Sequence, residues 1–186
     1  MDLWIVRHGE TEWSRDLKHT GTTDVPLTEK GLEQAKALAP VLAGHRFGRV
    51  LCSPLQRADE TARLAGFPDA ERIDLLHEFR YGDYEGLTTE EIRKQRPDWN
   101  MWTDGCPGGE TPEEVGERCD ELLRLIGEPD DDVLVIAHGH LLRVLTARYL
   151  DLPPSAGGKW AIDTAGYSIL GHERERHVIR RWNLVP

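Results

Sequence analysis

The sequence predicts an α/β fold in which a mainly parallel central sheet carries helices on both faces. Short, continuous apolar runs at residues 3–6, 49–52 and 133–137 are typical of strands that are covered on both sides. Segments in which apolar residues recur at helical spacing lie between these runs, and strands that alternate with helices form parallel sheets. The chain of 186 residues is predicted to be one domain, residues 1–186, because that length permits a single sizeable core.

The first predicted strand is residues 3–6, Leu-Trp-Ile-Val. A helix is expected from Thr28, whose side chain suits an N-cap, to about Gly44, a residue type that ends helices. Between these limits the apolar residues fall on one helical face, namely Leu32, Ala35, Leu38, Ala39 and Leu42. A loop separates this helix from the first strand, because the apolar residues between them follow neither the strand nor the helix spacing.

The second predicted strand is residues 49–52, Arg-Val-Leu-Cys. A helix is expected to follow it directly and to reach about Ala65, because Ser53 suits an N-cap and Pro54 suits the first helical position. Residues 73–76 are expected to form a third, weaker strand. The alternation of strand and helix thus continues through this part of the chain.

Two capping boxes mark the next helices. Thr88 and Glu91 have the spacing that opens a short helix, and Thr111 and Glu114 have the spacing that opens a longer one. Apolar residues continue the longer helix on one face, at Val115, Cys119, Leu122 and Ile126. Residues 97–109 lie between the two helices and have no period, so we expect an ordered, aromatic-rich loop there and not a linker between domains.

The strongest strand pattern in the chain is residues 133–137, Val-Leu-Val-Ile-Ala. His138 then leads directly into a helix that is expected to reach about Leu150. Two further apolar runs, residues 167–170 and 178–182, flank a charged segment that suits a turn. These two runs are therefore expected to form a β-hairpin.

The net charge of the chain is negative. With 23 Lys and Arg against 33 Asp and Glu, the formal charge is −10. This balance argues against a general nucleic-acid-binding protein, because such proteins usually carry a basic field or a basic face. An anionic small substrate remains compatible with it, because a pocket can be locally positive. The expected partner is therefore a small metabolite and not a nucleic acid.

The three cysteines, Cys52, Cys106 and Cys119, are odd in number and lack CxxC spacing, so they indicate neither a disulfide framework nor a zinc ribbon. Reduced thiols fit the cytosol best. The first apolar run is too short for a signal peptide or a membrane span. We therefore expect a soluble, cytoplasmic protein without a membrane partner. A homodimer through a sheet edge or a helix face stays open.

Charged side chains follow three of the predicted strands. Arg7 and His8 follow the first, Arg57 lies one helical turn beyond the second, and His138 follows the strongest one. In α/β sheets ligands bind beyond the carboxyl ends of the strands, so we expect these side chains in one pocket. A guanidinium fork fits a phosphoryl group bidentately, and the N–H groups from Gly139 onward, where a helix opens, add positive potential. The pocket is thus expected to bind phosphate.

His8 suits a nucleophile, because a neutral imidazole can attack phosphorus to form a phosphohistidine that water then hydrolyses. A lone histidine at a strand end more often packs or caps, but its convergence with Arg7, Arg57 and His138 favours the catalytic interpretation. The departing alkoxide needs a proton, and Glu78, after the third strand, is the candidate donor. A solvated surface glutamate fits its spacing equally well. A bound phosphate would favour the protonated carboxyl by like-charge repulsion.

Five motifs in a fixed order carry a family resemblance: RHGET at 7–11, HTGTTDVPLTEKG at 19–31, CSPLQRADETA at 52–62, YGDYEG at 81–86 and AHGH at 137–140. Along essentially its whole length the chain resembles the histidine phosphatase superfamily, also called the phosphoglycerate mutase-like family. The resemblance implies that fold, with His8 as the phosphorylated residue and Glu78 as the acid and base. It also implies a phosphate pocket formed by Arg7, Arg57 and His138.

The resemblance also suggests substrate-binding residues. Ser14 stands where members of the family frequently carry Asn, and its hydroxyl keeps a polar group there for phosphate contact. Thr20 and Gly21 match a substrate-side loop, although an ordinary turn would look the same. Gly139 would contribute its backbone N–H. For Glu10, direct contact with substrate and pairing with an arginine are equally compatible with the motif.

Within the superfamily the chain looks most like small acid phosphatases and sugar-bisphosphate phosphatases. It lacks the insertion and long tail that shield the phosphohistidine of cofactor-dependent phosphoglycerate mutases, so hydrolysis of small phosphorylated metabolites is expected. Two alternatives stay open. A cofactor-dependent phosphoglycerate mutase would need a bisphosphate primer, and a phosphate-binding regulatory module would have no turnover.

No cofactor and no metal are expected. His138 and His140 form a candidate ligand pair, but no cluster of Asp or Glu accompanies them, and the arginines can neutralise the phosphoryl oxygens. For His140, a place in the pocket wall and packing at the helix start are both open. Trp99 and Trp102 are expected either to roof the pocket and select the leaving group, or to plug a hydrophobic space under their loop.

Overall fold

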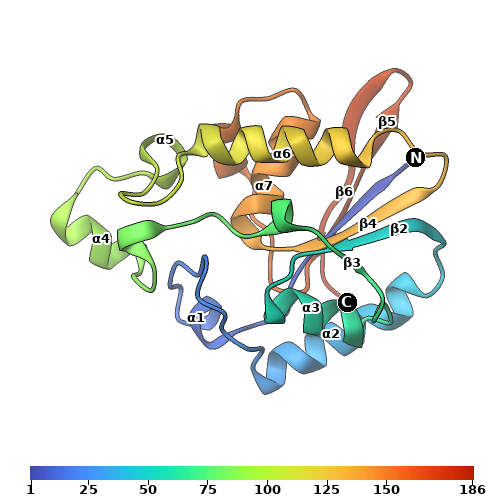
Figure 1. Cartoon of the computed structure of the whole chain (residues 1–186), viewed down its shortest axis with the longest axis horizontal. Coiled ribbons are helices and arrows are strands. Elements are labelled where there is room, and N and C mark those ends of the chain that lie inside the picture. The colour runs from blue at the N-terminus through green and yellow to red at the C-terminus, as the bar shows by residue number, and fades with distance from the viewer.

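The computed structural model describes all 186 residues. At its centre is a six-stranded sheet with the strand order β3-β2-β4-β1-β5-β6 (Figure 1). Neighbouring strands from β3 to β1 are parallel, whereas β5 and β6 run antiparallel to their neighbours. The strands are β1 (Leu3–Arg7), β2 (Phe47–Cys52), β3 (Glu71–Arg72), β4 (Asp132–Ala137), β5 (Tyr167–Glu173) and β6 (Arg176–Leu184). The predicted α/β fold with a mainly parallel sheet is confirmed.

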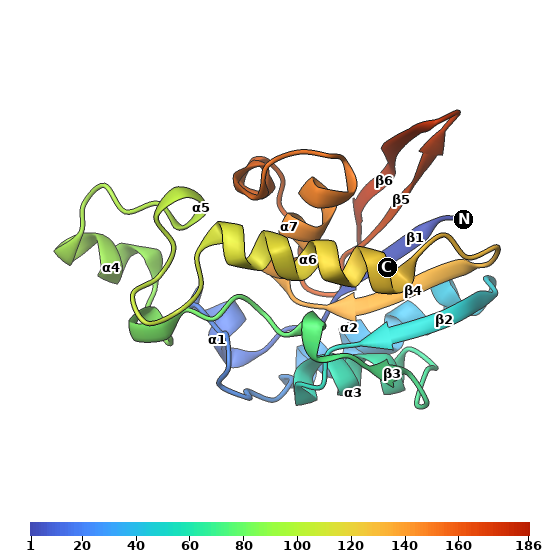
Figure 2. The ribbon, with the colours of Figure 1, turned by 45° about the horizontal axis from the view of Figure 1, so that its top comes forward.

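Helices cover both faces of this sheet, with α2 and α3 on one side and α6 and α7 on the other (Figure 2). The helices are α1 (Glu12–Arg15), α2 (Glu29–Leu42), α3 (Gln56–Leu64), α4 (Thr89–Gln95), α5 (Met101–Asp104), α6 (Pro112–Ile126) and α7 (Gly139–Tyr149). Three 3₁₀ segments lie in the connections, at Asp74–Leu76, Gly82–Tyr84 and Pro154–Lys159. None of the helices combines the length and the apolar character that crossing a membrane requires.

The central strands are apolar throughout because each face of the sheet is covered. In β1, Leu3 and Ile5 belong to the core beneath α6 and α7, while Trp4 and Val6 belong to a second core with residues of α2 and α3. The residues of β4 divide between the two cores in the same alternating way. A strand with two buried faces shows no polar alternation, which explains the continuous apolar runs of the sequence.

The helix starts predicted from threonine caps are confirmed. The Thr88 side chain accepts the N–H of Glu91, whose carboxylate accepts the N–H of Thr88, and Thr111 and Glu114 form the same reciprocal pair. Thr28 caps α2 with its side chain. The predicted hairpin is also present as β5 and β6.

The predicted N-cap at Ser53 is wrong. α3 begins at Gln56, and Leu55 occupies the N-cap position without a side-chain hydrogen bond. The Ser53 hydroxyl lies 2.7 Å from Nε2 of His138 instead. The N–H of Gln56 donates to the carboxylate of Asp24 at 2.9 Å. Ser53 still accepts the N–H of Leu55 at 3.3 Å, but the first N–H of α3 is satisfied by Asp24, from a distant part of the chain.

Two other predictions need correction. The third strand, β3, lies earlier than predicted and has only two residues, because residues 74–76 turn away from the sheet edge and bury Leu76 in the core beneath α6. Residues 97–109 contain the short helix α5, which the sequence did not predict. Asn100 caps this helix by accepting the N–H of Trp102. A helix of four residues is too short to display a period.

Candidate active site

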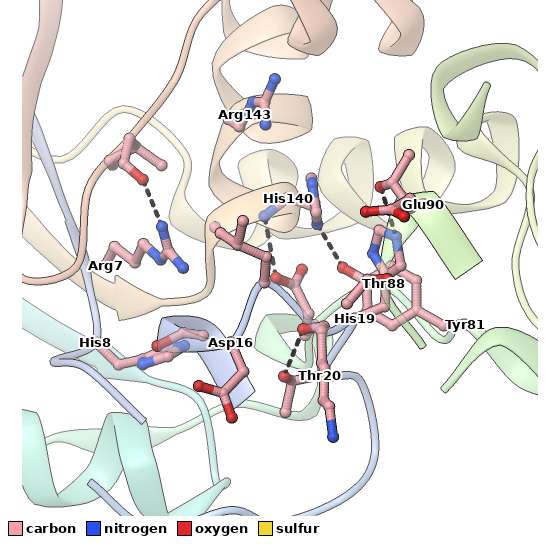
Figure 3. A pocket seen from close by; sticks show the side chains of 17 residues that line it. Arg7, His8, Asp16, His19, Thr20, Tyr81, Thr88, Glu90, His140 and Arg143 are labelled. Atoms are coloured by element: carbon pink, nitrogen blue, oxygen red, sulfur yellow. Dashed lines mark hydrogen bonds between the residues drawn. The ribbon is translucent and has the colours of Figure 1, made fainter. Parts of the chain in front are cut away.

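The carboxyl ends of β1, β4 and β2 meet at one edge of the sheet. The three strands are adjacent and parallel, with Arg7 opposite Ala137 and Cys52 opposite Ile136. A pocket of about 560 Å³ opens at this edge, between the loop after β1, the start of α4 and the start of α7 (Figure 3). The fold therefore brings the polar residues that follow these strands to one place.

His8 lies in the pocket wall with only 5% of its surface exposed. Its Nδ1 is 2.7 Å from the carbonyl oxygen of Gly9. Because a carbonyl can only accept, Nδ1 carries the proton and Nε2 keeps its lone pair. Burial, followed by the charges of Arg57 and Arg7, holds the pKa of His8 well below its ordinary value. His8 is therefore a neutral imidazole whose Nε2 is available as a nucleophile.

Arg7 lies beside His8 in the wall (Figure 3). One of its Nη atoms donates to the carbonyl oxygen of Ile162 at 2.7 Å, while its Nε is buried without a hydrogen-bond partner. Gly139 permits this packing, because a Cβ there would lie 3.2 Å from Nε of Arg7. A buried donor costs free energy until an acceptor pairs with it, so Arg7 is suited to bind an anion.

Arg57 and His138 are fully buried behind the pocket and do not line it. Nε of Arg57 donates to Nδ1 of His138 at 3.2 Å, and its Nη atoms donate to main-chain carbonyls within residues 20–23. His138 must then donate from Nε2 to the hydroxyl of Ser53. Its ring meets that of His8 edge-on, with centroids 5.1 Å apart.

This arrangement differs from the direct phosphate contact that the sequence predicts for Arg57 and His138. Here the two residues support His8 and the loop of residues 20–23. The difference arises because a buried guanidinium needs an acceptor for each of its donors, and the loop carbonyls and the His138 ring supply them.

Glu78 is buried, with 5% of its surface exposed, and it lines the pocket. Its Oε1 accepts the N–H groups of Phe79 and Leu141 at 2.8 Å, and its Oε2 accepts the N–H of His140 at 3.0 Å. Two of these donors, the N–H groups of His140 and Leu141, belong to the first turn of α7. The interpretation of Glu78 as a solvated surface residue is therefore wrong.

Ser14, Thr20 and Gly139 line the pocket, as predicted for substrate-binding residues, whereas Gly21 does not. A Cβ on Gly21 would lie 2.6 Å from the carbonyl oxygen of Phe79. This glycine therefore permits two loops to pack closely, and contact of Gly21 with a substrate stays a prediction.

The hydroxyl groups of Ser14 and Thr20 are already engaged within the protein. Ser14 donates to the carbonyl of Thr11 at 3.0 Å and accepts the N–H of Thr11 at 2.9 Å, which closes the capping box of α1. The hydroxyl of Thr20 donates to the carbonyl of Lys18 at 3.0 Å. Contact of these side chains with a substrate phosphate stays a prediction.

The loop that carries His8 is fixed by the start of α2. The carboxylate of Glu10 is 2.8 Å from Nζ of Lys30 and accepts the hydroxyl of Thr28, so pairing of Glu10 with an arginine is wrong. Gly9 and Gly31 pack backbone to backbone, because a Cβ on Gly9 would lie 2.4 Å from the carbonyl oxygen of Gly31. Only glycine fits at such an approach.

Sequence reasoning missed much of the pocket wall, which also contains Asp16, Leu17, Lys18, His19, Tyr81, Thr88, Thr89, Glu90, Arg143 and Ile162. Arg143 carried a usable signal, because it follows Gly139 by four residues, one turn along the same face of α7. Lys18 and Thr88 carried none. They pair as an isolated β-bridge that joins two loops far apart in the sequence.

His140 belongs to the pocket wall, which decides between the two places that the sequence left open. Its Nδ1 is 2.5 Å from the hydroxyl of Tyr81, and burial holds its pKa well below the ordinary value. Trp102 lies outside the wall and packs edge-on against His140, and the guanidinium of Arg143 lies 4.3 Å from its ring centroid. Trp102 therefore supports two wall residues, whereas Trp99 is buried in the core.

The wall carries as many cationic as acidic side chains, with Arg7, Lys18 and Arg143 against Asp16, Glu78 and Glu90. The histidines add no charge near neutral pH, because burial lowers the pKa of His19 to about 4 and holds those of His8 and His140 well below their ordinary values. No group of three or more His, Cys, Asp and Glu side chains is arranged to hold a metal ion. The absence of a metal requirement stays a prediction.

Comparison with known proteins relates the chain to phosphatases. Residues 3–185 match the sequence model described as histidine phosphatase superfamily, branch 1. The acid phosphatase of Mycobacterium tuberculosis is 43% identical over 180 residues, which cover 92% of this chain and 86% of that protein. The sedoheptulose 1,7-bisphosphatase of Saccharomyces cerevisiae is 36% identical over 182 residues, which cover 80% of this chain and 67% of that protein.

Solved structures agree with the sequence comparison. The structure of an open reading frame product from Mycobacterium tuberculosis has a TM-score of 0.95 and 40% identity, covering 99% of this chain and 97% of that one. The α-ribazole phosphatase from Shigella flexneri has a TM-score of 0.86 and 28% identity, covering 99% and 96%. The family match over residues 3–185, together with these relatives, leads to one conclusion: the chain belongs to the histidine phosphatase superfamily.

Proposed function

We propose that this protein hydrolyses small phosphorylated metabolites through a phosphohistidine formed at His8. The observation that carries the proposal is the state of His8 in the pocket wall. Its Nδ1 is bound to the Gly9 carbonyl, its ring is neutral, and the unpartnered Nε of Arg7 is buried nearby. A neutral imidazole beside an unsatisfied guanidinium donor suits attack on a phosphoryl group.

The reaction has two displacements. In the first, Nε2 of His8 attacks phosphorus, the bond to the ester oxygen breaks, and the departing oxygen takes a proton from the carboxyl of Glu78. In the second, the Glu78 carboxylate accepts a proton from water as the water oxygen attacks the phosphohistidine. Inorganic phosphate leaves, and both His8 and the protonated Glu78 are restored.

The developing negative charge would be neutralised without a metal ion. Arg7 offers its buried Nε. The N–H groups of Gly139, His140 and Leu141 at the start of α7 have no intrahelical partner. Glu78 accepts those of His140 and Leu141, so the N–H of Gly139 is left to bind the phosphoryl group. We assign Arg57 and His138 the task of holding His8 and the loop of residues 20–23. Full activity in EDTA is expected. Loss of activity on chelation would contradict neutralisation of the charge without a metal ion.

The composition of the pocket wall supports a small, polar substrate, because only three of its seventeen residues are hydrophobic. Lys18, His19 and Arg143 lie beyond Arg7 and His8 and offer polar contacts to the part of the substrate that carries the phosphate. The similarity to an acid phosphatase and to a sedoheptulose 1,7-bisphosphatase also supports a small phosphorylated metabolite as the substrate. A screen of phosphate release over a broad panel of phosphorylated metabolites identifies the preferred substrate.

Two alternatives predict different outcomes in that screen. A cofactor-dependent phosphoglycerate mutase would need a bisphosphoglycerate primer, so phosphate release that is independent of primer favours the hydrolase. A phosphate-binding regulatory module would release no phosphate from any ester. His8→Ala should abolish turnover in the hydrolase, because no other side chain replaces the nucleophile.

A cytoplasmic location belongs to the same proposal. All three cysteines are unpaired and buried. Burial raises the pKa values of all three thiols to about 12, so they persist as protonated thiols. Unpaired cysteines suit a reducing compartment. Fractionation of the cells that make the protein tests this location.

A further inference from the structure

The main chain that carries Glu78 is held by an arginine of another element. Arg118, on α6, points its guanidinium at residues 75–78, and its side chain is only 15% exposed. One Nη atom donates to the carbonyls of Leu75, at 2.9 Å, and His77, at 2.5 Å. The other Nη atom donates to the carbonyl of Glu78 at 3.3 Å. A single side chain thus binds three carbonyls of this segment.

Glu110 completes this contact. Its carboxylate, with 4% of the side chain exposed, receives a bidentate pair from Arg118: Nε to Oε1 at 3.1 Å and Nη2 to Oε2 at 3.0 Å. Glu110 also pairs with the main chain of Arg80 in both directions, because Oε2 accepts the N–H of Arg80 and the carbonyl of Arg80 accepts the N–H of Glu110, both at 2.8 Å.

Arg118 and Glu110 line a second cavity, of about 370 Å³, and Glu78 is the one residue that lines both this cavity and the active-site pocket. The segment from 75 to 80 is therefore fixed from two directions. The carboxylate of Glu78 is bound by N–H groups that include those at the start of α7, and the main chain around it is bound by Arg118 and Glu110.

We propose that Arg118, locked by Glu110, is the positioning residue for the acid Glu78. This inference rests on the proposed role of Glu78 as proton donor to the leaving group. Arg118 uses all five of its N–H donors in this contact, and a lysine would keep the charge but could not form the bidentate pair and bind the carbonyls together. Loss of the contact frees the main chain of an acid whose position must be set to within about 1 Å.

Arg118→Lys tests the proposal through the leaving group. An alkyl phosphate such as glycerol phosphate needs a proton for its alkoxide, whereas the 2,4-dinitrophenolate of dinitrophenyl phosphate departs without one. The variant should lose about tenfold or more in kcat/KM for the alkyl ester and about twofold or less for the dinitrophenyl ester. Glu78→Gln, which removes the proton donor itself, should show the same selectivity with a larger loss.

Arg148→Lys is the matched control. Arg148 on α7 forms a bidentate pair with Asp120 of α6, at 2.8 Å and 3.1 Å, and its remaining hydrogen bond is to the carbonyl of Leu152. The same substitution here breaks another bidentate arginine–carboxylate pair next to α6 without touching residues 75–80. It should leave the ratio of the two rates at the wild-type value.

A loss in Arg118→Lys that is equal for both esters, or no loss, overturns the positioning role. If Arg118→Lys fails to fold, as judged by circular dichroism and thermal unfolding, Glu110→Gln carries the same test because it removes the charge that locks the guanidinium. The two proposals fail separately. If Glu78→Gln loses the same factor for both esters, Glu78 is not the acid, and the inference falls with that role. If Glu78→Gln loses more for the alkyl ester but Arg118→Lys does not, only the inference is overturned.

Discussion

The reactivity of His8 is set by its neighbours. A main-chain carbonyl holds the proton on Nδ1, so that Nε2 is the free nitrogen. Burial and two arginines keep the ring uncharged. The sequence indicates the nucleophile through its place after a strand. The tautomer depends on the backbone conformation that turns the Gly9 carbonyl to the ring, and the charge state depends on burial and on Arg57, which the fold brings near.

The first chemical step should persist in mildly acidic solution. A pKa held well below the ordinary value of 6.5 means that His8 keeps its neutral, nucleophilic form as the pH falls below 6.5. Rapid-quench measurement of phosphoenzyme formation between pH 7 and pH 5 checks this, after correction for the second ionisation of the substrate, near a pKa of about 6. A loss of rate with a midpoint near pH 6.5 that the substrate does not explain would contradict the assigned state of His8.

Gly139→Ala should weaken catalysis through Arg7. A Cβ at this position would lie 3.2 Å from Nε and 3.3 Å from Cζ of Arg7, so the guanidinium must shift by a few tenths of an ångström. We expect kcat/KM to fall by about threefold, because a misplacement of about 1 Å costs about a hundredfold and this one is smaller. Gly44→Ala is the control, since a Cβ there meets no atom within 4 Å, and its activity should equal that of the wild type.

At this scale the sequence predicts which side chains come to the pocket better than it predicts their bonds. Arg7 and His8 line the pocket because they lie at the carboxyl end of β1. Glu78 lines it because it follows the 3₁₀ segment that comes after β3. Arg57 has the predicted place in the chain, yet its donors are taken up by loop carbonyls and by His138. No local pattern could reveal those bonds, because their acceptors lie more than thirty residues away in the chain.

Helix α7 connects Glu78 with the part of the pocket wall that His140 and Arg143 form. Its first turn donates two N–H groups to Glu78, and its wall-facing residues include His140 and Arg143. Outside the wall, Trp102 of α5 contacts both residues. We therefore expect substrate preference to depend on α5, although α5 itself does not line the pocket.

Trp102→Ala should change the relative rates among substrates and leave the chemical step in place. Removing the indole takes away the cation–π contact of Arg143 and the edge-on contact of His140, and neither residue acts on the phosphoryl group in the proposed mechanism. A kinetic comparison over the metabolite panel measures this change. Trp182→Ala on β6 is the control, because its indole packs on Trp160 and donates to the carbonyl of Ala161. Equal relative rates in both variants would remove this role.

The elements that the sequence predicts correctly are those whose signals are local. The capping boxes at Thr88 and Thr111 form as predicted, because both partners lie within four residues of each other. The cap at Ser53 fails because α3 begins only at Gln56, whose N–H donates to Asp24, more than thirty residues away. β3 and α5 were misplaced or missed because elements of two and four residues carry too little pattern.

The whole molecule places four histidines in or behind its active site: His8, His19 and His138 are buried, and His140 is half-buried. Burial holds all four pKa values below the ordinary 6.5, and that of His19 at about 4. These neutral rings therefore oppose protonation of the folded state. An acidic solution favours the unfolded chain, in which these rings can take up protons.

The free energy of unfolding should fall as the pH falls below 6.5. Below this value the unfolded chain binds more protons than the folded chain, so stability is lost until the pH passes the folded pKa, which for His19 is about 4. Each buried histidine steepens this loss by up to about 1.4 kcal/mol per pH unit. Urea denaturation at several values between pH 7.5 and 5 measures the slope.

A pair of variants isolates the contribution of one ring. His19→Gln removes a buried histidine and should give a shallower fall of stability with decreasing pH. His177→Gln removes an exposed histidine of the hairpin and should leave the slope as in the wild type. Identical slopes in the two variants would show that burial of His19 does not couple folding to pH.

The central claim for the whole protein is that a phosphoryl group passes through His8. Rapid acid-free quenching of the wild type during turnover of a ³²P-labelled ester tests it most directly. We predict an acid-labile label on His8 that forms and decays at rates compatible with kcat, and no label on His8→Ala. Sustained phosphate release without any labelled His8 would contradict the account.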